Sequence, residues 1–181
     1  MINIDLDITL VEYIKEKCNK AIDKDIEEMV KVALKEKKLE NNVNISISVA
    51  SVSEIHELNK KYREVDKPTD VLSFPIFSRE EIESDSIVEL QEIDLGDIII
   101  CIDVVEEHAK EYETGILRET MYMITHGICH LIGYDHENEV DKKEMRALEE
   151  KILSKIGVNI VNEWWFKIKK KRRKHWEVKG C

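Results

Sequence analysis

Three of the six histidines of this 181-residue chain lie in the eleven-residue segment HGICHLIGYDH. His126 and His130 are four residues apart. On a helix, both imidazoles would therefore project from one face, with Cβ atoms roughly 5–6 Å apart. Gly133 stands where this helix should end, because glycine readily adopts the left-handed conformation that reverses a chain. His136 follows three residues later, so the spacing predicts a site where three imidazoles converge.

Three converging imidazoles are typical of a hydrolytic metal site. Neutral imidazoles would fill three positions of a tetrahedral zinc ion and leave the fourth position for water. Zinc lowers the pKa of such a water towards about 7, so hydroxide can form near neutral pH. We therefore expect one zinc ion per chain, bound by His126, His130 and His136. Cys129 has apolar neighbours and is interpreted as a core residue.

The sequence lacks the general base of the helical metalloproteases. In their H-E-x-x-H motif, a glutamate directly follows the first histidine. Gly127 occupies that position here. Proteolysis by this mechanism is therefore disfavoured.

The composition indicates a globular chain of one domain. Hydrophobic residues make up 43% of the sequence and charged residues 36%, and a chain of this length can bury one substantial core. No segment approaches the roughly 18 uninterrupted apolar residues of a membrane span. The first ten residues lack the layout of a signal peptide. We therefore expect a cytoplasmic protein with no membrane span, whose four scattered cysteines are reduced.

The elements that must position the histidines are predicted from hydrophobic spacing. INIDL, from Ile2, and NISISV, from Asn44, alternate apolar and polar residues like half-buried strands. DIIICI, from Asp97, is a short apolar run typical of a central strand buried on both faces. VDKPTDVLSFP is expected to be extended, and residues 78–94 are interpreted as an acidic connection.

Five helices are expected among these segments, because apolar residues recur at three- and four-residue spacing. In chain order they are one long helix over residues 14–33, a helix from Ser51, a helix from Asp103 to Gly115, a helix over residues 116–132, and a helix from Asn138 to Gly157. Few strands among several helices indicate a layered α+β fold.

Two of these helices are predicted to begin with a side-chain cap. Ser51 with Glu54 forms a capping box. Asp103 with Glu106 has the same spacing and is interpreted as a second cap. Tyr62 is expected to belong to the buried stripe of the helix that Ser51 begins.

Two long motifs make the sequence similar to a known family. HGICHLIGYDH resembles the H-G-x-L-H-L-x-G-Y-D-H signature of the YbeY family of bacterial rRNA maturation endoribonucleases. LNKKYREVDKPTDVLSFP, from Leu58 to Pro75, resembles the family's L-N-x-x-Y-R-x-x-D-x-P-T-D-V-L-S-F-P, and LGDIII, from Leu95, matches a third block. The resemblance spans residues 1–157, which we expect to form the catalytic domain. Cys129 replaces the usual leucine, and the C-terminal tail, residues 158–181, lies outside the pattern.

The resemblance implies a fold and a set of site residues. The fold is an α+β domain with a small mixed β-sheet packed by several helices, and with the metal site on a helix-turn. The metal ligands would be His126, His130 and His136, and Arg63 matches an arginine held important for activity. Arg63 and His126 are accordingly the expected catalytic residues.

The resemblance also implies a reaction and its partners. The reaction is metal-dependent cleavage of single-stranded RNA during 16S rRNA 3′-end maturation and quality control of the small ribosomal subunit. The partners would be rRNA, the small subunit, ribosomal proteins and an assembly GTPase. The alternatives are a metallohydrolase of another kind, such as a peptidase, and a non-catalytic ribosome-assembly factor with a structural metal. A fourth protein ligand such as Cys129 would favour the structural role.

Several polar residues have both a site role and a simpler one. The guanidinium of Arg63 can pair bidentately with phosphate, but an arginine at a helix C-terminus is also favoured by the helix dipole. Asp135 could orient a ligand histidine or cap the next helix. Asp70 and Ser73 could line the site or form turn hydrogen bonds. The remaining histidines are expected to face solvent: His56, His108 and His175.

The formal charge of −10 is unevenly distributed. Residues 167–181 contain eight Lys or Arg and one acid, so the rest of the chain carries −17 and would repel nucleic acid. Trp164, Trp165 and Trp176 flank the basic run. We expect this tail to anchor RNA by releasing counterions from phosphates and stacking on bases. An inert tail and a membrane-surface segment are the alternatives.

Overall fold

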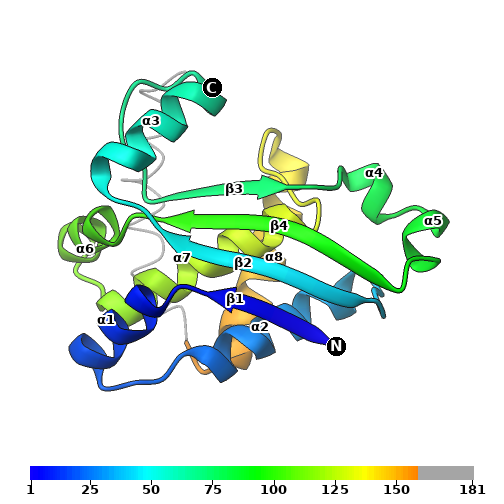
Figure 1. Cartoon of the computed structure of the whole chain (residues 1–181), viewed down its shortest axis with the longest axis horizontal. Coiled ribbons are helices and arrows are strands. Elements are labelled where there is room, and N and C mark those ends of the chain that lie inside the picture. Colours follow the sequence, from blue (N-terminus) through cyan, green and yellow to red (C-terminus); the bar gives the residue numbers. More distant parts are fainter. Residues whose placement is uncertain (159–181) are drawn as a thin grey trace.

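The structure is a computed structural model and describes residues 1–158. A four-stranded mixed β-sheet forms its centre (Figure 1). The strands are β1 (Ile2–Leu6), β2 (Asn42–Val49), β3 (Val71–Pro75) and β4 (Glu92–Ile100). Their order is β1-β2-β4-β3; β1, β2 and β4 are parallel, whereas β3 runs antiparallel to β4.

Among the described residues, five helices lie between the strands in the sequence, and three more follow the last strand. They are α1 (Ile8–Cys18), α2 (Asp23–Glu36), α3 (Val52–Arg63), α4 (Arg79–Ile82), α5 (Asp85–Val88), α6 (Ile102–Glu111), α7 (Ile116–Leu131) and α8 (Glu139–Lys155). The expected α+β fold with a small mixed sheet is confirmed. Within residues 1–158, none of these helices has the length and apolar character needed to cross a membrane.

Helix α7 lies at the centre of the main core. It packs across β3 and β4, while α1 and α2 cover the rest of the same face and α8 lies against α7 and α2 (Figure 1). Eleven of the sixteen residues of α7 are buried, so the helix is enclosed on most sides. A Cβ atom placed on Gly127 would lie 2.8 Å from Cδ1 of Ile98 in β4. The glycine therefore allows α7 to approach the sheet closely.

The opposite face of the sheet carries a smaller core beneath α3. Successive strand residues point to opposite faces. Val71 and Ile98 accordingly join the main core, whereas Leu72 and Ile99 pack with Ile55 of α3. The predicted capping box of Ser51 and Glu54 is present at the start of α3. Tyr62, however, is 56% exposed, so the expectation that it is buried is wrong.

The long helix predicted over residues 14–33 is two helices. Asn19 adopts a left-handed conformation with φ 49° and ends α1, and α2 begins at Asp23. Asparagine tolerates this conformation better than most residues. Both helices bury apolar residues in the same core, among them Ile14 and Ile26, which explains why the apolar spacing continued across the break.

Three other boundaries and one burial pattern differ from expectation. Cys101, not Asp103, is the N-cap of α6, and no side chain caps that helix. Gly115 does not end α6 but is the N-cap of α7. Strand β4 begins at Glu92, within the predicted acidic connection, and its residue Asp97 is exposed. The strand is interior to the sheet, and on its second face Ile99 packs with the smaller core beneath α3 while Asp94 and Asp97 are exposed, so burial alternates along it.

Candidate metal centre

The structure brings His126, His130 and His136 together at the end of α7. His126 and His130 lie one turn apart on the helix, and His136 lies in the loop that follows it. Gly133 has φ +84° and forms the predicted turn. The amide of Tyr134 donates to the carbonyl of Cys129 at 3.0 Å, which directs the chain back along the helix end. The turn at Gly133 therefore places His136 beside the two histidines of the helix.

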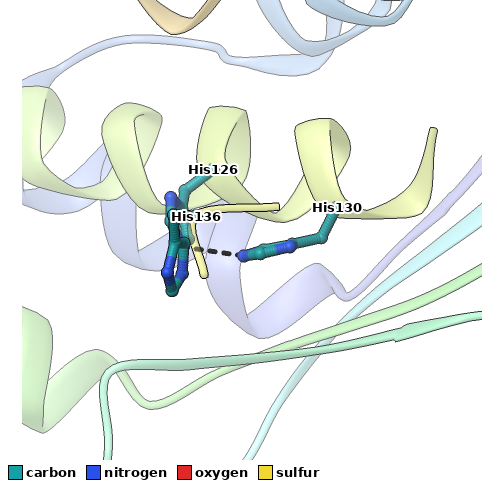
Figure 2. A group of neighbouring side chains, drawn as sticks. All are labelled: His126, His130 and His136. Carbon is teal, nitrogen blue, oxygen red and sulfur yellow. Dashed lines mark hydrogen bonds between the residues drawn. The ribbon is translucent and has the colours of Figure 1, made fainter. Parts of the chain in front are cut away.

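The three imidazoles face one small space (Figure 2). One nitrogen from each ring lies within 4.8 Å of the others, and Nε2 of His126 is 3.1 Å from Nε2 of His130. A tetrahedral ion with metal–nitrogen distances of about 2.0–2.1 Å would separate its ligand nitrogens by roughly 3.3 Å. The His126–His130 pair already has this spacing, and the three rings together could hold a metal ion.

Electrostatics favour the neutral form of two of these rings, those of His130 and His136. Burial, together with the neighbouring imidazoles of His126 and His136, lowers the pKa of His130 to about 3. Burial followed by the His126 imidazole also lowers the pKa of His136. Neutral imidazole is the form that donates a lone pair to a metal. The chain thus keeps these side chains ready to act as ligands.

A buried carboxylate orients the first histidine. Oε1 of Glu149, in α8, lies 2.7 Å from Nδ1 of His126, and Glu149 is only 2% exposed. With Nδ1 engaged as the donor, Nε2 has its lone pair directed into the cluster. Glu149 was missed in the sequence, although a signal was present. Its position, four residues after Met145 and three before Ile152, puts a charged residue in the apolar stripe of the helix.

No other ligand-type side chain joins the cluster within residues 1–158. Cys129 is fully buried, and this burial raises the pKa of its thiol well above the usual value. It packs in the main hydrophobic core, as the sequence indicated. The described residues therefore supply three candidate ligands, one fewer than the four protein ligands of a closed structural zinc site.

Arg63 is the last residue of α3 and is exposed. Its guanidinium forms no hydrogen bond or ion pair with other residues in the described part of the chain. The positive charge of Arg63 helps to lower the pKa of both His130 and His136, although burial and the neighbouring imidazoles contribute more. The structure therefore brings Arg63 close enough for its charge to act on the cluster.

Two other polar candidates, Asp135 and Asp70, accept hydrogen bonds from the backbone. Asp135 accepts a hydrogen bond from the amide of His136 at 2.7 Å, and Asn138 rather than Asp135 caps α8. Asp70 accepts from the amide of Val71 at 2.9 Å.

His108 departs from the expectation that it faces solvent. Its side chain is 19% exposed, and its Nδ1 is 3.1 Å from Oδ2 of Asp70. His56 is partly exposed and pairs with Asp66. The remaining histidine of that expectation, His175, lies outside the described residues.

The fold and the cluster together define a candidate metallohydrolase. Comparison with known sequences gives its family: the profile described as Endoribonuclease YbeY matches residues 10–157. A protein named endoribonuclease YbeY from Thermoanaerobacter sp. (strain X514) is 41% identical over 140 residues, which are 74% of this chain and 86% of that protein. The chain belongs to the YbeY endoribonuclease family.

Further relatives agree with this assignment. A protein of the same name from Caldicellulosiruptor saccharolyticus is 41% identical over 146 residues, covering 80% of this chain and 92% of that protein. The solution structure of a Thermotoga maritima protein aligns with a TM-score of 0.51 at 27% identity, covering 86% of this chain and 91% of that chain. The likeness therefore extends over most of the described fold.

Proposed function

We propose that this endoribonuclease cleaves single-stranded RNA with one zinc ion held by His126, His130 and His136. The convergence of three largely buried imidazoles on one space carries the proposal. Their nitrogen ligands suit zinc better than magnesium or calcium, which prefer oxygen. When bound, zinc would polarise a phosphoryl oxygen and lower the pKa of a water molecule towards neutrality.

The chain's own residues supply the remaining requirements. Glu149 holds the His126 ring in one tautomer and one orientation, so that Nε2 stays directed at the ion. Arg63 offers a planar fork that can pair with two oxygens of a phosphodiester, where negative charge grows during cleavage. Arg63 is available for this role because no side chain among the described residues forms an ion pair with it. His126 and Arg63 are therefore our proposed catalytic residues.

The substrate we propose is the 3′ end of 16S rRNA on the small ribosomal subunit, in the cytoplasm. Family membership supports an RNA substrate. A strongly acidic domain must meet a polyanion through local positive groups. Arg63, a bound cation and the basic run of residues 167–174 would be such groups, and the last of these lies outside the described residues. Contacts with ribosomal proteins and an assembly GTPase belong to the same proposal.

The structure gives reasons to prefer this proposal to its alternatives. A peptidase of the H-E-x-x-H kind needs a glutamate at position 127, but that position packs against Ile98 and has no room for a side chain. A purely structural metal would be expected to have a fourth protein ligand, and none is present among residues 1–158.

Cleavage of a fluorescently labelled single-stranded RNA tests the proposal. Cleavage by the wild-type protein should stop when a chelator removes the metal and resume when zinc is added. His130→Ala should remain inactive under both conditions. Wild-type cleavage that continues in chelator, or equal cleavage by the wild-type and His130→Ala proteins after zinc is added, would refute the proposed site. A duplex of the same sequence serves as the substrate control.

A further inference from the structure

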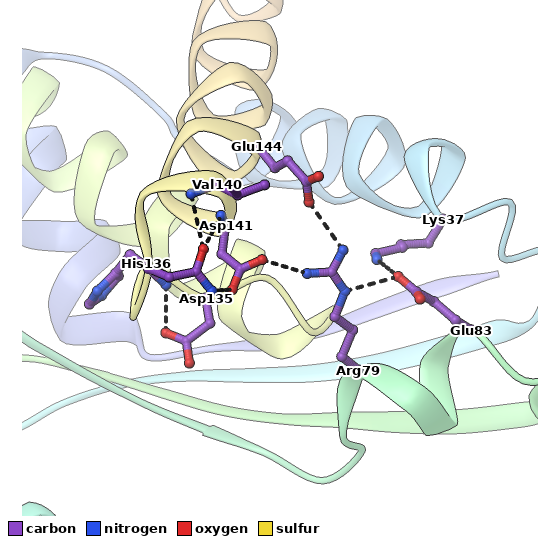
Figure 3. Close-up of polar contacts among 9 residues, drawn as sticks. Lys37, Arg79, Glu83, Asp135, His136, Val140, Asp141 and Glu144 are labelled. Carbon is purple, nitrogen blue, oxygen red and sulfur yellow. Dashed lines mark hydrogen bonds and ion pairs between the residues drawn. The ribbon is translucent and has the colours of Figure 1, made fainter.

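The strongest unexplained feature near the cluster is the ion-pair network of Arg79 (Figure 3). Arg79 is the first residue of α4, in the segment that the sequence identified only as an acidic connection. One nitrogen of its guanidinium lies 3.2 Å from Asp141 and another 3.1 Å from Glu144, both in the first turns of α8. Its Nε is also 3.3 Å from Glu83. A single side chain thus joins α4 to the start of α8.

The same residue contacts the loop that carries His136. A Cβ atom placed on Gly133 would lie 2.8 Å from Cα of Arg79, so the loop backbone passes directly against this residue. The Arg79 guanidinium carbon is 6.0 Å from the centre of the Tyr134 ring. Lys37 approaches the same ring at 4.4 Å. The beginning of the loop is therefore packed against Arg79.

The end of the loop is attached to Arg79 through Asp141. The side chain of Asn138 caps α8 by accepting from the amides of Val140 and Asp141 at 2.9 and 3.0 Å. Its amide group also donates to the Asp141 carboxylate. Arg79 holds that same carboxylate from the other side. His136 lies between these two attachments, two residues before the cap (Figure 3).

We propose that Arg79 is a positioning residue for the metal centre, fixing both ends of residues 133–138 so that His136 remains opposite His126 and His130. This inference rests on the proposed metal site. The ion pairs of Arg79 are partly exposed, with 37% of its side chain accessible, and such pairs contribute little to global stability. Their effect should therefore appear in the geometry of the loop rather than in the stability of the fold.

Zinc affinity separates these two effects. In the full-length protein, Arg79→Ala should weaken zinc binding about tenfold, as is typical when a group that supports a ligand is lost. Competition with a chromophoric chelator measures the affinity, and the zinc-induced rise in Tm measures it independently. The Tm of the metal-free protein should change little.

Lys151→Ala is a matched control, because Lys151 also connects α8 to another element through an exposed ion pair, with Glu36 at 2.5 Å. Its loss should lower the metal-free Tm about as much as Arg79→Ala does, but leave zinc affinity unchanged. Arg79→Lys can reach one acidic partner but not both, so its affinity should be intermediate. Combining Arg79→Ala with Asp141→Asn should weaken binding less than the sum of the two single changes, because both act on one link.

The results distinguish failure of this inference from failure of the proposed metal site. Zinc affinity in Arg79→Ala equal to that of the wild type would overturn the role of Arg79 alone. A wild-type protein that binds no zinc would overturn the metal site and this role with it. If Arg79→Ala does not fold, the zinc affinities of Arg79→Lys and Asp141→Asn test the inference instead. Wild-type zinc affinity in both variants would also overturn it.

Discussion

The carboxylate of Glu149 lies 2.7 Å from Nδ1 of His126, across 23 residues of sequence. This contact joins α8 to α7 at the candidate metal centre and determines which imidazole nitrogen faces the other two rings. A buried carboxylate–histidine pair of this kind both orients a metal ligand and increases its basicity. Its removal should therefore affect metal binding more than it affects the hydrophobic core.

Glu149→Gln should weaken zinc binding by about 10- to 100-fold, because glutamine keeps the size of the side chain but loses its charge. Isothermal titration with zinc measures the change. Glu150→Gln is the matched control, since Glu150 is the next residue of α8 and is exposed. Similar affinities for the two variants would show that Glu149 has no influence on the site.

Removal of any one of the three clustered histidines should abolish stoichiometric metal binding. Elemental analysis of protein purified without added metal should give about one zinc per wild-type chain. His130→Ala should contain much less than one, because two imidazoles alone hold zinc weakly. His56→Ala should match the wild type, since His56 pairs with Asp66 outside the cluster. Wild-type metal content in His130→Ala would exclude this residue as a ligand.

Arg63→Ala should retain its metal and its fold but lose RNA cleavage by about 10²- to 10³-fold, the usual cost of removing a group that stabilises charge in the transition state. Arg63→Lys should recover little of this loss, because an ammonium group lacks the bidentate fork. Single-turnover cleavage rates measure both effects. Lys60→Ala, which removes another cation of α3, is the control. A fully active Arg63→Ala protein would leave Arg63 as a surface residue at a helix end.

Gly127→Ala should destabilise the fold by about 1 kcal/mol, because overpacking against the sheet outweighs the gain in helix propensity. The added methyl group would meet Cδ1 of Ile98 at 2.8 Å. Replacing Ile98 with valine removes that atom, so the double variant should recover part of the loss. Urea unfolding of the four proteins measures the coupling. Additive free energies of unfolding would contradict direct packing between these two positions.

Deletion of residues 167–181 should weaken RNA binding and flatten its dependence on salt, because fewer counterions would be released from the phosphates. These residues lie outside the described part of the chain, so the prediction rests on their sequence. Binding of single-stranded RNA across a salt series tests it, while zinc content should be unchanged. An identical affinity and an identical slope would indicate an inert tail.

Local sequence signals predicted the features that depend on neighbouring residues. The capping box of Ser51 and Glu54 and the turn at Gly133 need only a few adjacent side chains, and both are present. The break at Asn19 was missed because two helices that bury residues in one core share a continuous apolar spacing.

The residues that position the clustered histidines could not be predicted from neighbouring sequence. Arg79 contacts residues more than 50 positions away, and Glu149 reaches the first histidine from another helix. Such contacts depend on how α4, α7 and α8 pack, which hydrophobic spacing alone does not specify. The sequence therefore predicted that the three imidazoles converge, but it did not predict which residues hold them in position.

The enclosure of α7 gives the three histidines two different kinds of support. His126 and His130 belong to a helix built into the hydrophobic core, so their spacing is preorganised before any ion arrives. His136 belongs to the segment between α7 and α8, so its position depends on polar contacts rather than on the core. Loss of an ion should therefore leave the hydrophobic core intact, whereas loss of those polar contacts should displace His136 alone.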